Sequence, residues 1–266
     1  MPVRTQIAGA RVLITGGASG MGLLMARGAL QRGASKVVVW DLQKEQVERA
    51  VKVLGERASG YVVDVSNPAR VREWAKKVGD IDILINSAGV VTGKSLLENT
   101  DAAIKKTFAV NTLALYWTAR AFLPGMIRQN SGCIVTMASA AGLLGVAGLT
   151  DYAPSKWAAI GFSESVRQEL RKSGNNVNCL SVCPYYVDTG MFGGVRTKVP
   201  HLLPILKPGE VAEAALRGIE KGKTQVTMPL LVRALPLVKA LPVAAFDAVM
   251  DYFGINQAME EFHGRK

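Results

Sequence analysis

The sequence predicts an α/β fold, a single doubly wound parallel sheet of seven strands with an apolar C-terminal extension. Short apolar runs alternate with helical patterns along most of the chain. Several of these runs are apolar at successive positions, which is typical of parallel strands covered by helices on both faces. No linker and no internal repeat interrupts the alternation, so residues 1–266 are expected to form one domain.

The expected elements follow one another in a regular order. The strand segments are rich in apolar and β-branched residues, as in KVVVWD, and the helical segments are amphipathic, as in QKEQVERAVKVLGE. This pattern places strands at residues 10–17, 36–41, 60–65, 81–89, 131–139, 176–184 and 224–229. It places helices at residues 20–34, 43–56, 68–79, 101–130, 152–173 and 209–222. The two series interleave, as the strand–helix–strand units of a parallel sheet require.

The composition excludes several classes of protein. With 49% hydrophobic and 20% charged residues, the chain can bury a sizeable core and is not expected to be disordered. Its 32 basic and 21 acidic residues give a net charge of +11, but the basic residues are spread along the chain, so no nucleic-acid surface is expected. Residues 1–10 show no signal-peptide pattern. The uncharged run at 129–150 contains glycines and hydroxyl residues, which favours a strand and loop over a membrane span.

The cysteines indicate a reducing compartment. Cys133, Cys179 and Cys183 are odd in number and have no disulfide spacing. Cys179 and Cys183 lie four residues apart in one expected strand, about 13 Å from each other, which is too far for a bridge. A cytoplasmic location is therefore expected.

A glycine-rich turn follows the first expected strand. TGGASGMG at residues 15–22 lies between a strand and a helix, where glycines allow the backbone to approach a pyrophosphate and the helix N-terminus supplies N–H donors. Asp41 ends the second strand and can accept hydrogen bonds from an adenosine ribose. Ala18, Ser19 and Leu42 offer no cation for a 2′-phosphate, so NAD is favoured over NADP, with Lys44 as the nearby exception. These features predict a Rossmann-type dinucleotide site.

Further motifs appear in a characteristic order and spacing. They are DV at 64–65, NSAG at 86–89, Asn111, Ser139, and Tyr152 with Lys156. Together with the glycine turn, they resemble the short-chain dehydrogenase/reductase family over nearly the whole chain. The resemblance implies an NAD(P)-dependent alcohol dehydrogenase or carbonyl reductase, with Asn111, Ser139, Tyr152 and Lys156 as its catalytic residues.

The catalytic chemistry can be argued from these residue types. Moving a hydride to or from a carbinol carbon requires a proton to join or leave the oxygen, and Tyr152 is the expected general acid–base. Its phenol needs nearby positive charge to lower the pKa, and Lys156, one helical turn away, is expected to supply much of it together with the oxidised nicotinamide. Ser139 is expected to hydrogen-bond the substrate oxygen, and Asn111 to hold a water next to Lys156. In DYAPSKW, Asp151 is expected to cap the helix and Pro154 to lie in its first turn, which places Tyr152 at an exposed helix mouth.

The resemblance also implies a wider set of contacts, without a metal. The loop CPYYVDTGMF would hold the nicotinamide carboxamide, and Tyr185 departs from the glycine that is usual after the proline. The implied cofactor-binding residues are Gly16, Ser19, Gly20, Met21, Gly22, Asp41, Asp64, Val65, Asn86, Ala88, Gly89, Tyr152, Lys156, Pro184, Val187 and Thr189. The implied substrate pocket contains Ala140, Tyr185, Met191 and Phe192.

Two apolar segments indicate a hydrophobic substrate. Residues 187–208 are expected to form a substrate lid, and residues 228–266 a C-terminal apolar segment. Prolines recur within 228–250 beside the single cations Arg233 and Lys239, so this run is interpreted as an interfacial segment, an oligomer contact or a cover over the pocket. Both segments resemble the retinol dehydrogenase and 17β-hydroxysteroid dehydrogenase branch, most of all the epidermal retinol dehydrogenase type. That branch usually has a membrane anchor, which is not recognised at the start of this sequence.

The sequence thus predicts an NAD-dependent oxidoreductase for a hydrophobic alcohol and its aldehyde or ketone. Alternatives are a carbonyl reductase for compact aromatic or steroid ketones, and a non-catalytic dinucleotide-binding regulator. A homodimer or homotetramer is expected, because the helix at 101–130 carries the apolar residues Phe108, Leu115, Trp117 and Phe122. The expected location is cytoplasmic, with peripheral membrane contact as one interpretation of the C-terminal segment.

Overall fold

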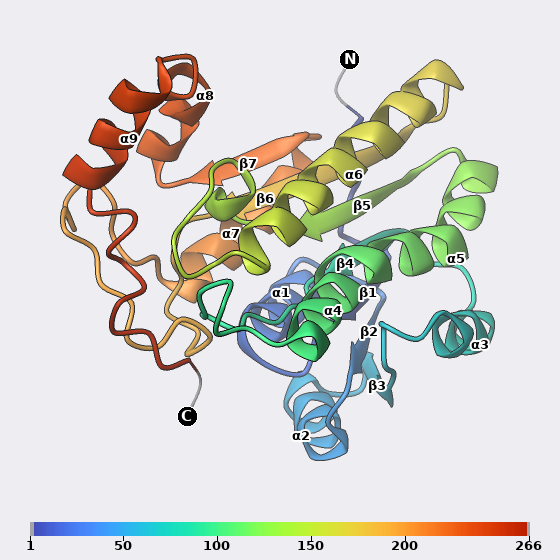
Figure 1. The fold of residues 1–266 in the computed structure, drawn as a ribbon. Coiled ribbons are helices and arrows are strands. Elements are labelled where there is room, and N and C mark those ends of the chain that lie inside the picture. Colours follow the sequence, from blue (N-terminus) through green and yellow to red (C-terminus); the bar gives the residue numbers. More distant parts are fainter. Residues whose placement is uncertain (1–2, 265–266) are drawn as a thin grey trace.

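A computed structural model describes residues 3–264, and Figure 1 shows a central parallel sheet between two layers of helices. The ends of the expected domain at 1–2 and 265–266, and with them the last two residues of the expected C-terminal segment, lie outside the described residues. The sheet has seven strands in the order β3-β2-β1-β4-β5-β6-β7, all paired in parallel, which confirms the predicted fold class. Their bounds are β1 Arg11–Thr15, β2 Lys36–Asp41, β3 Ala58–Val62, β4 Ile83–Asn86, β5 Gly132–Met137, β6 Val177–Pro184 and β7 Gln225–Met228.

Each predicted helix is present near its predicted range, with one interruption, and two further α-helices lie in the described part of the 228–266 segment, where none was predicted. Their bounds are α1 Gly20–Gln31, α2 Lys44–Leu54, α3 Pro68–Val78, α4 Asp101–Phe108, α5 Ala114–Gln129, α6 Tyr152–Lys172, α7 Pro208–Glu220, α8 Leu235–Val238 and α9 Val243–Tyr252. The helix expected at 101–130 is divided by a π-helical turn, Ala109–Leu113, between α4 and α5. Such turns widen the helix locally and often lie at functional sites, and this one carries Asn111.

The helices cover both faces of the sheet and form two apolar layers. On one face α1, α2 and α7 pack on the strands, with Met25 and Leu216 fully buried between them. On the other face α3, α5 and α6 contribute Val71, Phe122 and Phe162. The strand order reverses beside β1, whose neighbours are β2 and β4, and a ligand crevice is expected outside the carboxyl ends of the strands at this switch point.

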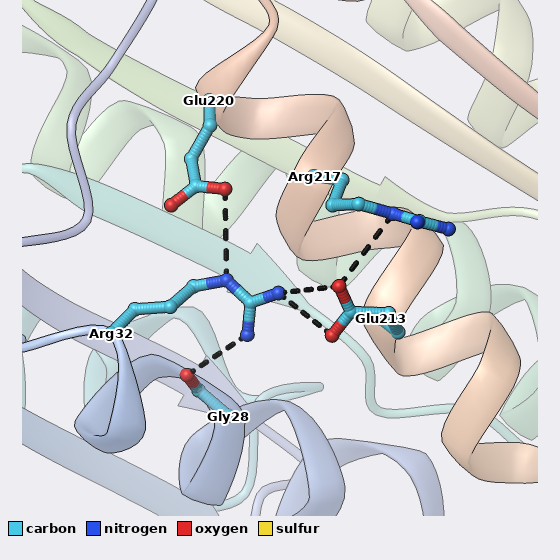
Figure 2. Close-up of polar contacts among 5 residues, drawn as sticks. All are labelled: Gly28, Arg32, Glu213, Arg217 and Glu220. Carbon is cyan, nitrogen blue, oxygen red and sulfur yellow. Dashed lines mark hydrogen bonds and ion pairs between the residues drawn. The ribbon is translucent and has the colours of Figure 1, made fainter.

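An arginine at the end of α1 ties this helix to α7 (Figure 2). The Arg32 Nη2 donates to both carboxylate oxygens of Glu213 at 2.7 Å, and its Nη1 donates to the Gly28 carbonyl at 3.2 Å. Glu220 and Arg217 extend the cluster through ion pairs of 3.6 Å. The hydrogen bond from Arg32 holds the pKa of Glu213 below its ordinary value. The cluster fixes α1, whose other end faces the ligand crevice.

The helix expected to form the subunit contact uses part of its apolar surface within the subunit. Leu115 and Phe122 are buried against the chain's own sheet, so they leave no surface for a second copy, contrary to the reasoning from sequence. Leu113, Tyr116 and Ile127 are the large apolar residues that this helix exposes instead. The apolar surface left for a subunit contact is smaller than the sequence suggested, because α5 packs closely against β4, β5 and α3.

After β7 the chain forms a lobe at one end of the molecule, made of a 3₁₀ turn, Leu230–Ala234, then α8 and α9 (Figure 1). Its inner side buries Val232, Met250 and Ile255 together with Leu203 of the 187–208 stretch. Its outer side exposes apolar side chains, among them Leu237. Within residues 3–264, none of the helices combines the length and the apolar character that crossing a bilayer demands.

Candidate active site

Two adjoining hollows open at the carboxyl ends of the strands. The larger spans about 1530 Å³ and the smaller about 800 Å³, and both volumes include space open to solvent. Ser139, Tyr152, Tyr185 and Phe192 line both. These four residues therefore mark the junction between a long cleft and an apolar pocket.

The glycine turn forms one end of the larger cleft. Gly16 adopts a φ of 63°, and a Cβ there would meet the Ala88 backbone at 2.8 Å. A Cβ at Gly22 would overlap the Gly16 carbonyl, so both positions require glycine for close backbone packing. Ser19 precedes α1 without making a side-chain cap, and the first turn of α1 has no acidic residue. The N–H donors of that turn are therefore available to an anionic ligand.

Asp41 lies beside this turn at the end of β2. Its Oδ2 accepts a hydrogen bond from the Ala18 N–H at 3.1 Å, and its Oδ1 accepts from the Leu42 N–H at 2.8 Å. Asp41 is half-buried on the cleft wall. The carboxylate is thus held in place by backbone donors, while its remaining lone pairs are free to accept from a ligand.

Most of the predicted cofactor-binding residues line this one cleft. They are Gly16, Ser19, Gly20, Met21, Gly22, Asp41, Asp64, Val65, Ala88, Gly89, Tyr152, Lys156, Pro184, Val187 and Thr189. Asn86 is placed differently, because it is buried beneath the cleft and its Oδ1 accepts from the Thr118 hydroxyl at 2.8 Å. Its observed contact joins β4 to α5. The side chains that sequence reasoning missed include Trp40, Gln43, Gln46 and Lys106, which no motif marks.

Of the four predicted catalytic residues, Ser139, Tyr152 and Lys156 line the cleft, whereas Asn111 is buried and lines neither hollow. Lys156 Nζ lies 5.5 Å from the centre of the Tyr152 ring and donates to the Met137 carbonyl at 2.8 Å. Ser139 is the residue before the short helix Ala140–Gly142, and its hydroxyl accepts from the Ala141 N–H at 3.1 Å. It also hydrogen-bonds Tyr152.

Asn111 fixes the π-helical turn against two neighbouring segments. Its Oδ1 accepts from the Val90 N–H at 2.9 Å, and its Nδ2 donates to the Val90 carbonyl and to the Ser155 hydroxyl. The Ser155 hydroxyl donates in turn to the Tyr152 carbonyl at 2.7 Å. A Cβ at Gly89 would lie 3.4 Å from Asn111 Oδ1 and 3.6 Å from Lys156 Nζ, so Asn111 and Lys156 face the same small space.

Burial dominates the acid–base properties of the site. It raises the pKa of Tyr152 to about 12, and the hydrogen bond with Ser139 acts in the opposite direction. Burial also lowers the pKa of Lys156 to about 8. In the chain alone, therefore, the pKa of Tyr152 is raised and not lowered, because burial removes the phenolate from water. The lowering expected from the sequence relies on Lys156 together with the positive charge of an oxidised nicotinamide.

Asp151 does not cap α6 as the sequence suggested. It makes no side-chain hydrogen bond to the helix backbone, and only 2% of its surface is exposed. Its carboxylate instead accepts from the hydroxyls of Thr92 and Thr107. Pro154 lies in the first turn of α6 as predicted, but Tyr152 is buried and not at an exposed mouth, because the C-terminal segment and the 187–208 stretch cover it.

The smaller pocket is lined almost entirely by apolar side chains. Of the predicted substrate residues, Ala140, Tyr185 and Phe192 line it, whereas Met191 lies on the wall of the larger cleft. Its other walls are Ala141, Leu144, Val146, Leu149, Tyr186, Leu203, Leu231, Val232, Ala234, Leu235, Val238, Val249, Met250, Phe253 and Ile255. Nine of these fifteen residues come from the C-terminal segment, so the inner side of that segment covers the pocket, which is one of the three interpretations of the sequence.

The fold and this arrangement agree with known proteins. Residues 10–200 match the family described as short chain dehydrogenase. The chain belongs to this family. As a short chain dehydrogenase, it is an oxidoreductase enzyme.

Relatives of this short chain dehydrogenase include the branch that the sequence resembles. The chain is 42% identical to epidermal retinol dehydrogenase 2 of Homo sapiens, over 99% of this chain and 88% of the relative. It is 38% identical to estradiol 17-beta-dehydrogenase 11 of Macaca fascicularis, over 93% of this chain and 84% of the relative. The predicted family and branch are therefore confirmed.

Solved structures of short chain dehydrogenases share the fold. One from Burkholderia phymatum, in complex with NAD, has a TM-score of 0.79 and 26% identity, over 89% of this chain and 95% of that one. Another from Burkholderia cenocepacia, in complex with NADP, has a TM-score of 0.78 and 27% identity, over 92% and 99% of the two chains.

Proposed function

We propose that this short chain dehydrogenase interconverts a hydrophobic alcohol and its aldehyde or ketone, with NAD as cofactor and Tyr152 as general acid–base. One observation carries the proposal. Tyr152 and Ser139 lie where a cleft lined by the glycine turn adjoins an apolar pocket. A group that transfers a proton belongs at such a junction, because the reacting carbon must face both cofactor and substrate.

The residues of the cleft fit a nicotinamide dinucleotide. The glycine turn and the first turn of α1 offer N–H donors for a pyrophosphate, and Asp41 can accept from ribose hydroxyls. Asp41 also favours NAD over NADP, because its charge would repel a 2′-phosphate. Lys44 is the nearby cation that could favour NADP. Its Nζ forms an ion pair with Glu48 Oε1 at 3.8 Å. The cofactor's chemistry, when it is bound, is to supply or accept the hydride.

The chain's own residues transfer the proton. In reduction the Tyr152 hydroxyl gives its proton to the carbonyl oxygen, and in oxidation it takes the proton of the alcohol. Ser139 hydrogen-bonds the same oxygen as it gains negative charge. Because burial raises the pKa of Tyr152 to about 12, the residue is protonated at neutral pH and suited to donation. Oxidation requires positive charge beside the phenolate, which Lys156 provides together with an oxidised nicotinamide.

The apolar pocket supports a lipophilic substrate. Its polar groups are concentrated at the junction with the cleft, and side chains such as Val232, Leu235 and Met250 form the walls. The names of the relatives, epidermal retinol dehydrogenase 2 and estradiol 17-beta-dehydrogenase 11, agree with this substrate class. Residues 187–208 act as the lid, since Leu203 packs on the C-terminal segment and the Arg196 N–H donates to the Ala258 carbonyl.

A panel of primary and secondary alcohols with NAD, graded by chain length and ring size, tests this function. Each added methylene that the pocket buries contributes about 0.8 kcal/mol, so kcat/KM should rise about fourfold per methylene until the pocket is filled. Val232→Thr should reduce this gain, whereas Val243→Thr on the exposed side of the lobe should not. A kcat/KM that is flat or falls with lipophilicity would contradict the proposal. Higher activity on compact aromatic or steroid ketones than on any alcohol would favour the carbonyl reductase alternative.

We also propose that the outer side of the C-terminal lobe contacts a membrane. Leu230, Leu237 and Val243 are 72%, 78% and 76% exposed, and the opposite side of the same segment lines the pocket. A lipophilic substrate could then enter from the lipid phase. In a flotation assay, the wild-type chain should rise through the density gradient with phospholipid vesicles. The double substitution Leu237→Glu and Val243→Glu should abolish this binding to vesicles. If the chain does not float and its mass in solution is that of a dimer which those substitutions dissociate, the surface is a subunit contact instead.

A homodimer or homotetramer remains our proposal for the assembly. Leu113 and Tyr116 on the α4–α5 helix expose apolar surface beside Phe162 of α6, with ring centres of Tyr116 and Phe162 4.6 Å apart. Light scattering at micromolar concentration should give a multiple of the 28.4 kDa chain mass. A monomeric mass would contradict this assembly.

A further inference from the structure

Two formally charged side chains are buried among the described residues, and they lie in the same stretch of chain. Asp151 is 2% exposed and Lys156 is 5% exposed. Lys156 belongs to the proposed catalytic set, whereas Asp151 has no role in the proposed proton transfer. A buried carboxylate is costly unless it is well hydrogen-bonded, so its partners indicate why it is there.

The Asp151 carboxylate joins three segments of the chain. Its Oδ2 accepts from the Thr107 hydroxyl of α4 at 2.7 Å, and its Oδ1 accepts from the Thr92 hydroxyl of the loop after β4 at 2.8 Å. Thr92 in turn accepts from Asn99 Nδ2 at 3.1 Å, across the same loop. Among the described residues the carboxyl group has no ion-pair partner, so its side-chain contacts are the two threonine hydroxyl donors.

A second set of bonds joins the same helix start to the π-helical turn. Asn111 Nδ2 donates to the Ser155 hydroxyl at 3.0 Å, and the Thr112 hydroxyl donates to the Ser155 carbonyl at 3.1 Å. Asp151 and Ser155 thus attach the first turn of α6 to α4 and to the π-helical turn at two successive points. Tyr152 lies between these two points.

We propose that Asp151 is a positioning residue that locks the first turn of α6 against α4 and the loop after β4, and so places the Tyr152 hydroxyl at the junction of the two hollows. This inference rests on the proposed role of Tyr152. Asp151 transfers no proton to the substrate, because its carboxylate is directed at Thr92 and Thr107 and it does not line either hollow. A misplacement of about 1 Å can reduce turnover by about 100-fold, so loss of one hydroxyl donor should affect chemistry more than binding.

The test removes one donor without changing the shape of the side chain. Thr107→Val deletes the hydroxyl, Thr107→Ser keeps it, and Asp151→Asn leaves a single acceptor oxygen. Thr5→Val is the matched control, because Thr5 is also buried and its hydroxyl donates to the Gly132 carbonyl at 3.1 Å, on the opposite side of the fold from the site. For each variant we would measure the thermal midpoint, the dissociation constant for NAD by fluorescence, and kcat and KM for the best alcohol.

We expect kcat to fall while the binding of substrate and NAD stays nearly unchanged. Thr107→Val and Asp151→Asn should lower kcat by about 10-fold or more, with KM and the NAD dissociation constant within about twofold of wild type. Thr107→Ser should retain the wild-type kcat. Thr5→Val should also retain it, while losing about as much stability as Thr107→Val. A kcat for Thr107→Val equal to that of Thr5→Val would overturn the proposal, as would a parallel loss of NAD binding. The variant Tyr152→Phe tests the role of Tyr152 separately, so a negative result for Asp151 leaves that role intact.

Discussion

Replacing Lys156 with methionine should stabilise the folded chain at neutral pH while removing activity. Burial lowers the pKa of Lys156 from 10.5 to about 8, so the folded chain holds the charged form at a cost. The 2.5-unit difference, 10.5 minus 8, corresponds to about 3 kcal/mol at 1.36 kcal/mol per unit. Methionine fills a similar volume without charge, but it leaves the Met137 carbonyl without its donor, which costs about 1 kcal/mol. The net gain should be about 2 kcal/mol.

The sign of this effect depends on pH. Between pH 8 and pH 10.5 the unfolded chain holds the lysine proton more tightly than the folded chain, so wild-type stability rises with pH through that window. The cost of Lys156 is therefore complete below pH 8 and disappears above pH 10.5. The advantage of the methionine variant should shrink by about 2 kcal/mol between pH 7 and pH 9.5.

Urea unfolding, followed by circular dichroism at both pH values, measures this difference. Lys52→Met is the control, since Lys52 is exposed on α2 and its replacement should change stability by no more than about 0.5 kcal/mol at either pH. A Lys156→Met variant that is less stable than wild type at pH 7 would refute the reasoning. So would an advantage that does not change with pH.

Three further variants test the cleft and the pocket. Gly22→Ala should abolish NAD binding in a fluorescence titration, because the new Cβ overlaps the Gly16 carbonyl, whereas Gly145→Ala has open space and should bind normally. Asp41→Asn should move the ratio of NADP to NAD affinity by about 10-fold or more towards NADP, since it removes a charge that repels a phosphate; an unchanged ratio contradicts the cofactor preference. Tyr185→Ala should raise kcat/KM for bulky substrates relative to slender ones, because Tyr185 lines both hollows at their junction; equal changes for both would show that it does not limit size.

Much of the fold could be predicted from local sequence pattern, because parallel strands and their covering helices have strong and different periodicities. The glycine turn was equally predictable, since Gly16 and Gly22 permit approaches that any other residue blocks. The turn at Ala109–Leu113 was not predicted, because a π-helical turn keeps the composition of the helix on either side. The pocket walls after β7 were only partly predicted, since apolar residues such as Val232 and Leu237 look alike in sequence although one is buried and the other exposed.

Electrostatics inside the site was the least predictable part. The spacing of Tyr152 and Lys156 predicted that they would be neighbours, and they are. It did not predict how deeply both are buried, and burial sets the direction of both pKa shifts. Asp151 was misread for the same reason, because a capping carboxylate and a buried acceptor for two threonines follow the same local pattern. Both depend on contacts between residues far apart in the sequence.

The central claim, that Tyr152 transfers the proton, is tested most directly by Tyr152→Phe. The substitution keeps the ring and its packing against Phe192, with ring centres 5.5 Å apart, and removes only the hydroxyl. We predict a loss of kcat of about 1000-fold for the best alcohol, with the NAD dissociation constant within about threefold of wild type. Turnover within 10-fold of wild type would contradict the account, and a chain that keeps a biological role without any turnover would be the dinucleotide-binding regulator instead.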